Sequence, residues 1–191
     1  MAKPTTEIVP ITRQDLTKSA QKVNSEFARY WEKEYINQRL SSIEDGSHKM
    51  LFTTLWYTGL RVSEVLALKK KDIDFSNYTL EALWQKNRKY KYRIVPMHPI
   101  IKNMLEIYCG NLKAEARLFP ITRQRAWQLC RRYFDGNPHM FRHSFAVNWL
   151  RGEGDIVILH KVLGHSRIQT TLEYLKIVPI DQGKELIKIT F

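Results

Sequence analysis

Residues 139–150 read HMFRHSFAVNWL, a stretch with the spacing of an amphipathic helix. On such a helix His139, Arg142 and His143 share one face, because residues three and four positions apart are neighbours on its surface. The remaining apolar side chains can serve a core, namely Phe141, Phe145 and Leu150. A face with several cationic hydrogen-bond donors suits a phosphodiester, whose non-bridging oxygens accept guanidinium contacts that strengthen as negative charge builds up. The stretch therefore predicts a phosphate-handling helix packed on a core.

Zinc binding is the main alternative for this helix, since His139 and His143 have the i, i+4 spacing of a metal-binding pair. The glutamate that zinc proteases carry between two such histidines is absent, however, and Arg142 would repel a cation. The sequence also has neither a GxxxxGKS or GxxxxGKT nucleotide loop nor a carboxylate cluster for two metals. We therefore expect no metal and no other cofactor.

Two further motifs flank this helix in the sequence: TGLRVSE, which holds Arg61 and Glu64, and LGH, which ends in His165. Tyr174 follows nine residues after that histidine. Each motif has an ordinary structural interpretation: a helix ion pair, a cation at a helix end, and a core aromatic. Their occurrence together and in order, with residue types that fit one reaction, favours a shared functional site.

The composition limits the class of protein. The 191 residues, 43% of them hydrophobic, suffice for one domain with a core. The net charge of +12 indicates a polyanionic partner, either nucleic acid or an acidic membrane surface. No stretch reaches the roughly 18–20 apolar residues of a membrane span, and the N-terminus has no signal core. Because Cys109 and Cys130 are too few for a disulfide framework, we expect a cytoplasmic protein and exclude secreted, membrane and zinc-finger classes.

The hydrophobic pattern predicts an α+β fold that is mainly α-helical with one small antiparallel β-sheet. The sheet is expected between Asp72 and Arg93, around a polar turn at Asn87-Arg88-Lys89. Helices are expected from Thr12 to a loop at Ser41–Gly46, over 47–58 until Gly59, over Val62–Leu68, from Pro99, from Thr122 to Phe134, from Pro138 to near Gly152, and after the N-caps Asp155 and Ser166.

The basic charge is concentrated in two segments. Residues 61–93 carry nine Lys and Arg against four acidic residues, and residues 113–143 carry seven against two. A charge run is usually a solvated face, but here aromatic residues and histidines interleave with the basic ones. This pattern favours contact with DNA, for which we select Lys69, Lys70, Lys71, Arg88, Lys89, Lys91, Arg123 and Arg125.

Three segments carry a family resemblance: GLRVSEVLALKKKDIDF, HMFRHSFAVNWL and LGHSRIQTTLEYLKI. They resemble the signature segments of the tyrosine recombinase (phage integrase) family, with similarity from about Ile11 to about Ile177. The resemblance implies the catalytic-domain fold of that family over residues 12–177, preceded by an extended arm at 1–11. The tail at 178–191 would fold back on its own domain or dock on a neighbouring subunit. Only 60 residues precede Arg61, so we expect no separate N-terminal core-binding domain.

The resemblance also implies a catalytic set, namely Arg61, Lys86, His139, Arg142, His165 and Tyr174. In this set Tyr174 would be the nucleophile, and the lysine of the β-hairpin would protonate the leaving oxygen. Lys89 and Lys91 are alternatives to Lys86 in the same hairpin. Glu64 and His143 would support the network around these groups rather than react.

The implied function is site-specific DNA recombination through a 3′-phosphotyrosyl intermediate, without metal or ATP. Two alternatives stay open: a type IB topoisomerase-like nicking-closing enzyme, and a non-catalytic DNA-binding derivative of the fold. The implied partner is double-stranded DNA, bound by a homo-tetramer on two sites in the nucleoid and by a monomer or weak oligomer otherwise. A partner recombinase or accessory protein would also fit, and a membrane would not.

Overall fold

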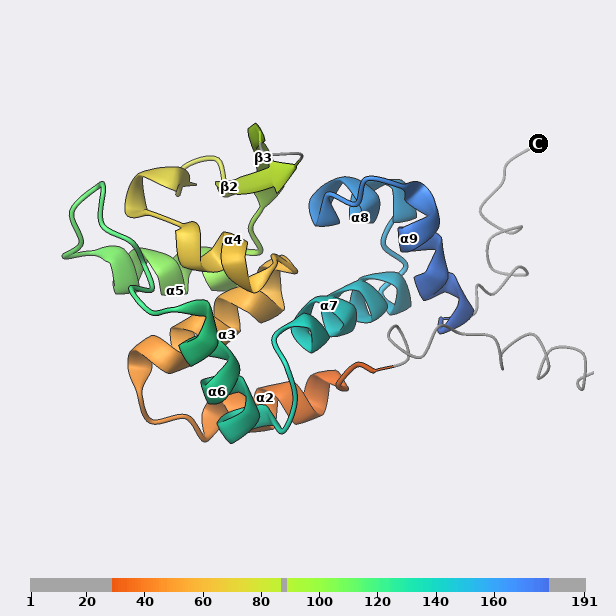
Figure 1. The fold of residues 1–191 in the computed structure, drawn as a ribbon, viewed down its shortest axis with the longest axis horizontal. Coiled ribbons are helices and arrows are strands. Elements are labelled where there is room, and N and C mark those ends of the chain that lie inside the picture. The colour runs from red at the N-terminus through yellow and green to blue at the C-terminus, as the bar shows by residue number, and fades with distance from the viewer. Residues whose placement is uncertain (1–28, 87–88, 179–191) are drawn as a thin grey trace, which may run out of the picture.

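The computed structural model describes residues 29–86 and 89–178 of the chain (Figure 1). The expected arm at 1–11, the first part of the helix expected from Thr12, the tail from residue 179, and Arg88 lie outside the described residues. The expectation of one helix reaching Ser41 is wrong at residues 29–32, which are not helical, and Glu32 has extended backbone angles before α2 begins at Lys33. The elements, in chain order, are α2 (Lys33–Ser41), α3 (Gly46–Thr58), α4 (Val62–Ala67), η1 (Lys70–Asp72), β1 (Ile73–Asp74), β2 (Thr79–Lys86), β3 (Lys89–Pro96), α5 (Pro99–Cys109), α6 (Arg123–Phe134), α7 (His139–Arg151), α8 (Ile156–Leu163), α9 (Ile168–Leu172) and η2 (Glu173–Lys176). The prediction of a mainly helical α+β fold with one small sheet is confirmed.

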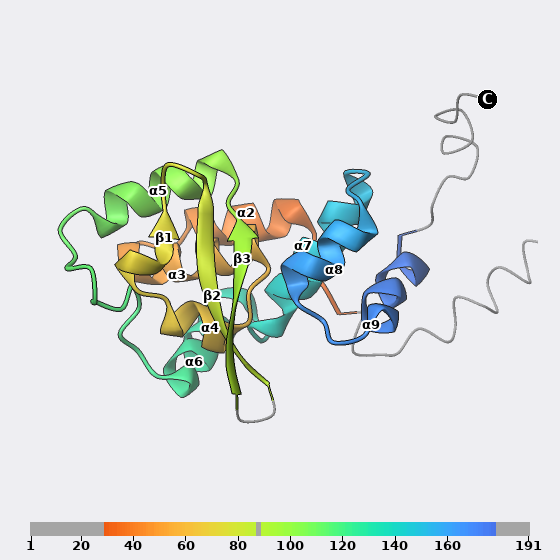
Figure 2. The same ribbon diagram turned by 90° about the horizontal axis from the view of Figure 1, so that it is seen from above.

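The sheet is antiparallel and has the order β1-β2-β3, with β2 and β3 forming a long hairpin. The pairing extends to Lys86 opposite Lys89. Lys89, which was expected in the turn, is therefore the first residue of β3. Buried and exposed side chains alternate along the strands, and Leu80, Ala82 and Val95 share the buried face. Figure 2 shows the strands side by side over α3 and α4, with α8 over α7 next to β3 and α9 farther from the sheet.

Most helix starts follow the expected capping residues. The side chains of Thr122 and Asp155 accept hydrogen bonds from backbone N–H groups of the first turns of α6 and α8. The expected cap at Ser166 is wrong by one position. Arg167 still has extended backbone angles (φ −131°, ψ 132°), so α9 begins only at Ile168.

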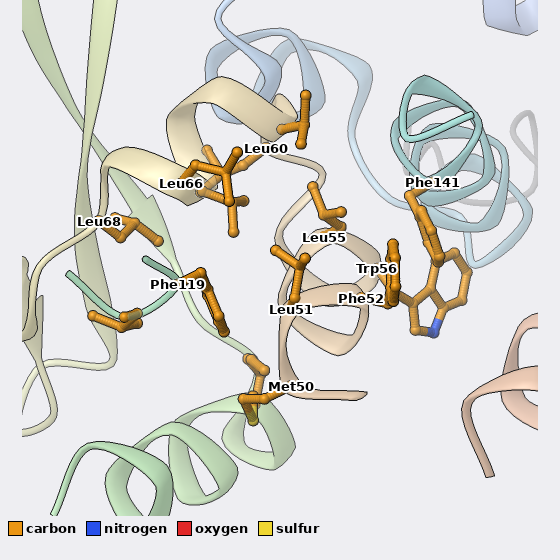
Figure 3. Close-up of a cluster of buried hydrophobic side chains, with 14 of the residues drawn as sticks. Met50, Leu51, Phe52, Leu55, Trp56, Leu60, Leu66, Leu68, Phe119 and Phe141 are labelled. Carbon is orange, nitrogen blue, oxygen red and sulfur yellow. The ribbon is translucent and has the colours of Figure 1, made fainter. Parts of the chain in front are cut away.

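The main core is built around α3, which is buried on several sides. Phe52 of α3, Phe134 of α6 and Phe141 of α7 form an aromatic cluster with ring centroids 4.8–5.6 Å apart. Figure 3 shows Phe141 of α7 directed at Phe52, beside Leu55. These buried aromatics fix α7 against α3. They therefore set the direction of the face of α7 that carries His139, Arg142 and His143, called the HMFRH face below.

A second, smaller cluster holds α8 and η2 against α7. Its buried members are Ala146, Val147, Leu159, Leu163 and Tyr174. The segment that carries Tyr174 thus packs in this small cluster and not in the main core. Within the described ranges, no helix is long and apolar enough to cross a lipid bilayer.

Candidate active site

Arg142 joins the three sequence motifs. Its side chain points from α7 into the protein and is 4% exposed. Nη1 donates to the carbonyl oxygen of Gly59 at 2.9 Å, and Nη2 donates to that of Leu163 at 2.6 Å. Both carbonyls lie at helix C-termini, of α3 and α8, whose partial negative charge favours a guanidinium. Burial, followed by the nearby charge of Arg61, lowers the pKa of Arg142 to about 9, which still leaves the group positive at neutral pH.

The two glycines next to these contacts are required by the backbone. Gly59 ends α3 with φ +62°, and a Cβ there would lie 2.5 Å from the ring of Phe145. Gly164 ends α8 with φ +64°, and its Cβ would lie 3.0 Å from Nε of Arg93. The glycines of the TGLR and LGH motifs therefore shape the turns from which the functional side chains emerge.

Arg61 stands at the start of α4 and is linked to Glu64 as the sequence suggested. Its backbone N–H donates to Glu64 Oε2 at 2.7 Å, and its Nη1 donates to Oε1 at 3.0 Å. The side chain of Arg61 is 30% exposed, whereas that of Glu64 is 4% exposed. Arg61 therefore keeps part of its guanidinium accessible while the buried carboxylate fixes its position.

Arg93 of β3 completes this cluster, and the sequence analysis did not single it out. Its Nη1 and Nη2 donate to the two carboxylate oxygens of Glu64 at 2.9 and 3.0 Å, and its Nε donates to the carbonyl of Val162 at 3.1 Å. Burial alone would raise the pKa of the Glu64 carboxyl, but the hydrogen bonds and charges of Arg93 and Arg61 lower it overall. Arg93 pairs with buried Ala82 across the hairpin and so lies on the buried face of the sheet, a position that became evident only from the strand register.

His165 stands between the arginines and the tyrosine. Its ring stacks on that of Tyr174 with centroids 6.4 Å apart. Burial, together with the charges of Arg142 and Arg61, lowers the pKa of His165 to about 3. The imidazole is therefore neutral at physiological pH and can act as a hydrogen-bond donor without a net charge.

The hydroxyl of Tyr174 lies 2.9 Å from Nδ1 of His143, and the tyrosine is 1% exposed. Burial, with the nearby charges of His139 and Arg142, lowers the pKa of His143 to about 4, so this imidazole is also neutral. His139 is half-buried at the first position of α7, where its ring meets that of Trp127 edge-on with centroids 6.4 Å apart. The HMFRH face is thus brought together with Tyr174, with His143 at the phenol oxygen.

The hairpin lysines are placed by the strand register. Lys86 and Lys89 face each other at the last pair of the ladder, and only their backbone is described. Lys91 is exposed and lies two residues before Arg93, on the same side of β3. All three therefore lie on strands that Arg93 attaches to α4 and α8.

The other basic residues selected for DNA contact divide into two groups. Arg123 and Arg125 are exposed on the first turn of α6. Lys69 and Lys71, in contrast, form ion pairs with Glu115 at 2.8 and 2.7 Å. Lys70 donates to the carbonyls of Gly110 and Leu112 at 3.1 and 2.9 Å. These three lysines hold the loop after α5 against η1, so the structure already gives each of them a partner.

No group of three or more His, Cys, Asp and Glu side chains that could hold a metal ion occurs among residues 29–86 and 89–178. The polar groups around Arg142 and Tyr174 are guanidiniums, neutral imidazoles, a phenol and the carboxylate of Glu64, which Arg61 and Arg93 already neutralise. Guanidiniums and imidazole N–H groups are the donors that suit an anion such as a phosphodiester.

Comparison with solved structures identifies the fold. The catalytic domain of bacteriophage HP1 integrase superposes with a TM-score of 0.66 at 21% identity, over 84% of this chain and 94% of that one. XerA recombinase gives 0.63 at 22% identity, over 85% and 66%. XerH recombinase, solved bound to its difH substrate, gives 0.63 at 21% identity, over 84% and 53%. The described domain has the fold of a tyrosine recombinase catalytic domain.

The sequence comparison identifies the family. Residues 32–179 match the Phage integrase family, and the chain belongs to that family. It is 33% identical over 150 residues to tyrosine recombinase XerC of Roseiflexus sp. (strain RS-1), covering 68% of this chain and 47% of that protein. It is 32% identical over 158 residues to tyrosine recombinase XerA of Saccharolobus solfataricus, covering 80% and 54%. The chain spans about half the length of these relatives.

Proposed function

We propose that this chain cuts and rejoins DNA strands as a site-specific recombinase, through a 3′-phosphotyrosyl intermediate and without metal or ATP. The observation that carries the proposal is the position of Arg142, which holds the ends of α3 and α8 together beside Tyr174. Arg61 and Arg142 are close enough for each charge to influence the other. Two guanidiniums beside a phenol match a phosphate whose charge grows during attack.

The proposed reaction begins with attack by the oxygen of Tyr174 on the scissile phosphorus. The phenolic proton passes to a ring nitrogen of a histidine, for which His139 and His143 are the candidates, and the P–O5′ bond breaks. A hairpin lysine, Lys86 in our assignment, gives its proton to the departing 5′ oxygen. The new P–O bond to tyrosine keeps the phosphodiester energy, so a 5′ hydroxyl of another strand can reverse the step.

Tyr174 has to become accessible before it can attack. Its side chain is 1% exposed and packs in the small cluster with Leu159, Leu163 and Val147. Movement of α9 and η2 away from α7 would break this cluster and the contact between Tyr174 and His143, and it would leave the aromatic core around α3 in place. We therefore propose that assembly on DNA releases Tyr174, so that cleavage is coupled to complex formation.

The proposed partner is double-stranded DNA in the nucleoid. XerH recombinase, which has the same fold, was solved bound to its difH substrate. Four protomers would act on two DNA sites, with the tail after residue 178 docking on a neighbour. The tail sequence supports this role because it has a short amphipathic pattern, with Leu186, Ile187, Ile189 and Phe191 apolar and Asp181, Lys184, Glu185 and Lys188 polar. A partner recombinase or accessory protein would act at the same step.

The test uses duplexes selected from a random library for cleavage, then rebuilt with a nick so that the 5′ product leaves. The wild-type chain is expected to form a protein–DNA adduct that resists denaturation, and Tyr174→Phe is expected to bind DNA without forming one. An adduct with the Phe variant would overturn the nucleophile assignment, and no adduct with wild type would indicate a non-catalytic DNA-binding protein. Holliday junctions from two duplexes separate a recombinase from a topoisomerase-like enzyme, which reseals one strand.

A further inference from the structure

Thr171 of α9 connects two histidines. Its side chain is completely buried, and Oγ1 lies 2.8 Å from Nδ1 of His165 and 3.1 Å from Nδ1 of His160. The centroids of the two imidazole rings are 6.5 Å apart, and the ring of His165 also stacks on that of Tyr174. One hydroxyl thus touches the candidate catalytic histidine on one side and a second histidine, from the last turn of α8, on the other.

A hydroxyl has one proton, so Thr171 can donate to only one of these two nitrogens. Hydrogen bonds donated by O–H groups are typically shorter than those donated by N–H groups. The shorter contact, to His165, therefore fits a bond donated by Thr171, and the longer one fits a bond donated by Nδ1–H of His160. This direction makes Nδ1 of His165 an acceptor, which leaves its single hydrogen on Nε2.

The tautomer matters because His165 is neutral, and a neutral imidazole donates through one nitrogen only. With the hydrogen on Nε2, the ring offers an N–H beside Tyr174 and the two arginines. With the hydrogen on Nδ1, the ring would turn a lone pair toward a negatively charged oxygen. The first arrangement stabilises a phosphate and the second repels it.

We propose that Thr171 and His160 are positioning residues that fix His165 in its Nε2–H form, so that it can donate to a non-bridging oxygen of the scissile phosphate. Thr171 acts by donating its hydroxyl hydrogen to Nδ1 of His165. His160 acts by donating Nδ1–H to the oxygen of Thr171, so that the hydroxyl hydrogen is directed at His165. The phosphate contact rests on the proposed function, whereas the tautomer is a property of the protein alone.

The tautomer is measured first, by long-range 1H–15N correlation of the histidine rings in the full chain at neutral pH. We expect the Nε2–H form at His165 and Nδ1–H at His160. Thr171→Val keeps the shape without the hydroxyl and should give His165 mixed tautomers, while Thr171→Ser should keep the Nε2–H form. A wild-type His165 with its hydrogen on Nδ1, or an unchanged spectrum in the Val variant, would overturn the proposal.

A second pair of variants reaches the same hydrogen bond from the other side. His160→Gln retains an N–H donor, whereas His160→Leu removes it, and only the Leu variant should give His165 mixed tautomers. This pair keeps the proposal testable if Thr171→Val does not fold, because the side chain of His160 is only half-buried. Equal spectra of the Gln and Leu variants would remove His160 from the proposal.

The catalytic consequence is measured as the rate of adduct formation on nicked DNA. Loss of one oriented donor should slow Thr171→Val by about tenfold or more, with Thr171→Ser close to wild type. Replacing one non-bridging oxygen of the scissile phosphate with a methyl group gives two stereoisomers, and one of them lacks the oxygen that accepts from His165. On DNA with that stereoisomer, Thr171→Val and Thr171→Ser should react equally fast. A defect that is the same on both stereoisomers would count against the phosphate contact. If wild type forms no adduct while the tautomers are as expected, the proposed function fails and the tautomer assignment stands.

Discussion

Arg93 and Glu64 form a two-pronged ion pair, with Nη1–Oε1 at 2.9 Å and Nη2–Oε2 at 3.0 Å, between strand β3 and helix α4. The side chains are 12% and 4% exposed, so water screens the pair weakly. The carboxylate of Glu64 also holds Arg61. The hairpin that carries the candidate lysines is thereby fixed relative to Arg61.

Replacing Arg93 with lysine should therefore affect both stability and reaction rate. A single ammonium cannot reproduce the two parallel bonds to Glu64, so we expect a loss of about 1–3 kcal/mol in the free energy of unfolding. Adduct formation should fall by about tenfold, because Arg61 and the hairpin lose their common support. Urea unfolding and the adduct assay measure the two effects.

The matched control for Arg93 is the ion pair between Lys102 and Glu106 on α5, in which the carboxylate side chain is 53% exposed. Lys102→Ala should lower the free energy of unfolding much less than Arg93→Lys does and leave the adduct rate unchanged. Equal effects of Arg93→Lys and Lys102→Ala would mean that the buried pair has no special role.

The depressed pKa values of His143 and His165 predict a loss of stability in mild acid. Their folded-state values, about 4 and about 3, lie below the usual value of roughly 6.5 for an unfolded chain. The unfolded chain therefore binds protons first, so the stabilisation is complete above that value and is lost as the pH falls. Between pH 7.5 and 5, each histidine should remove about 2 kcal/mol or less.

The measurement is urea unfolding at a series of pH values down to 5, where acidic side chains are still largely ionised. His143→Gln keeps a polar side chain near Tyr174 and should make the pH dependence about half as steep. A wild-type stability that does not change between pH 7.5 and 5 would contradict neutral, buried histidines.

Two glycines of α3 provide a matched test of backbone geometry. Gly59→Ala requires a left-handed conformation and places Cβ 2.5 Å from the ring of Phe145, so we expect a cost of about 2 kcal/mol or more. Because the carbonyl of Gly59 accepts from Arg142, adduct formation should also fall. Gly46→Ala, at the start of the same helix with open space around Cβ, should be neutral or stabilise by up to about 1 kcal/mol. Thermal unfolding of both variants decides the point, and a Gly59→Ala protein as stable as Gly46→Ala would contradict the geometry.

The sequence was sufficient for most features that depend on residues close in the chain, with the cap of α9 as an exception. Caps such as Thr122 and Asp155 and the shared face of α7 are set by side chains within one helical turn. The family resemblance added the order of the motifs, and the fold and family are confirmed.

What the sequence did not reveal are pairings between distant segments. Arg93 meets Glu64 across 29 positions, and Lys69 meets Glu115 across 46. Neither pair has a local pattern, because the partners are brought together only by the packing of the hairpin and the loop after α5. The spacing of the lysines likewise does not show which of them have a partner. Lys69 forms an ion pair with Glu115, whereas Lys91 is exposed.

The last prediction concerns which hairpin lysine protonates the leaving oxygen. DNA with sulfur in place of the bridging 5′ oxygen has a leaving group that needs little protonation. Lys86→Ala should therefore form adduct slowly on normal DNA and at nearly the wild-type rate on the sulfur substrate. Lys89→Ala and Lys91→Ala are the matched controls, since one faces Lys86 in the ladder and the other lies two residues further along β3, and neither should show such rescue. Rescue of Lys89→Ala or Lys91→Ala instead of Lys86→Ala would move the acid to that position, and rescue of none would place the proton donor outside the hairpin.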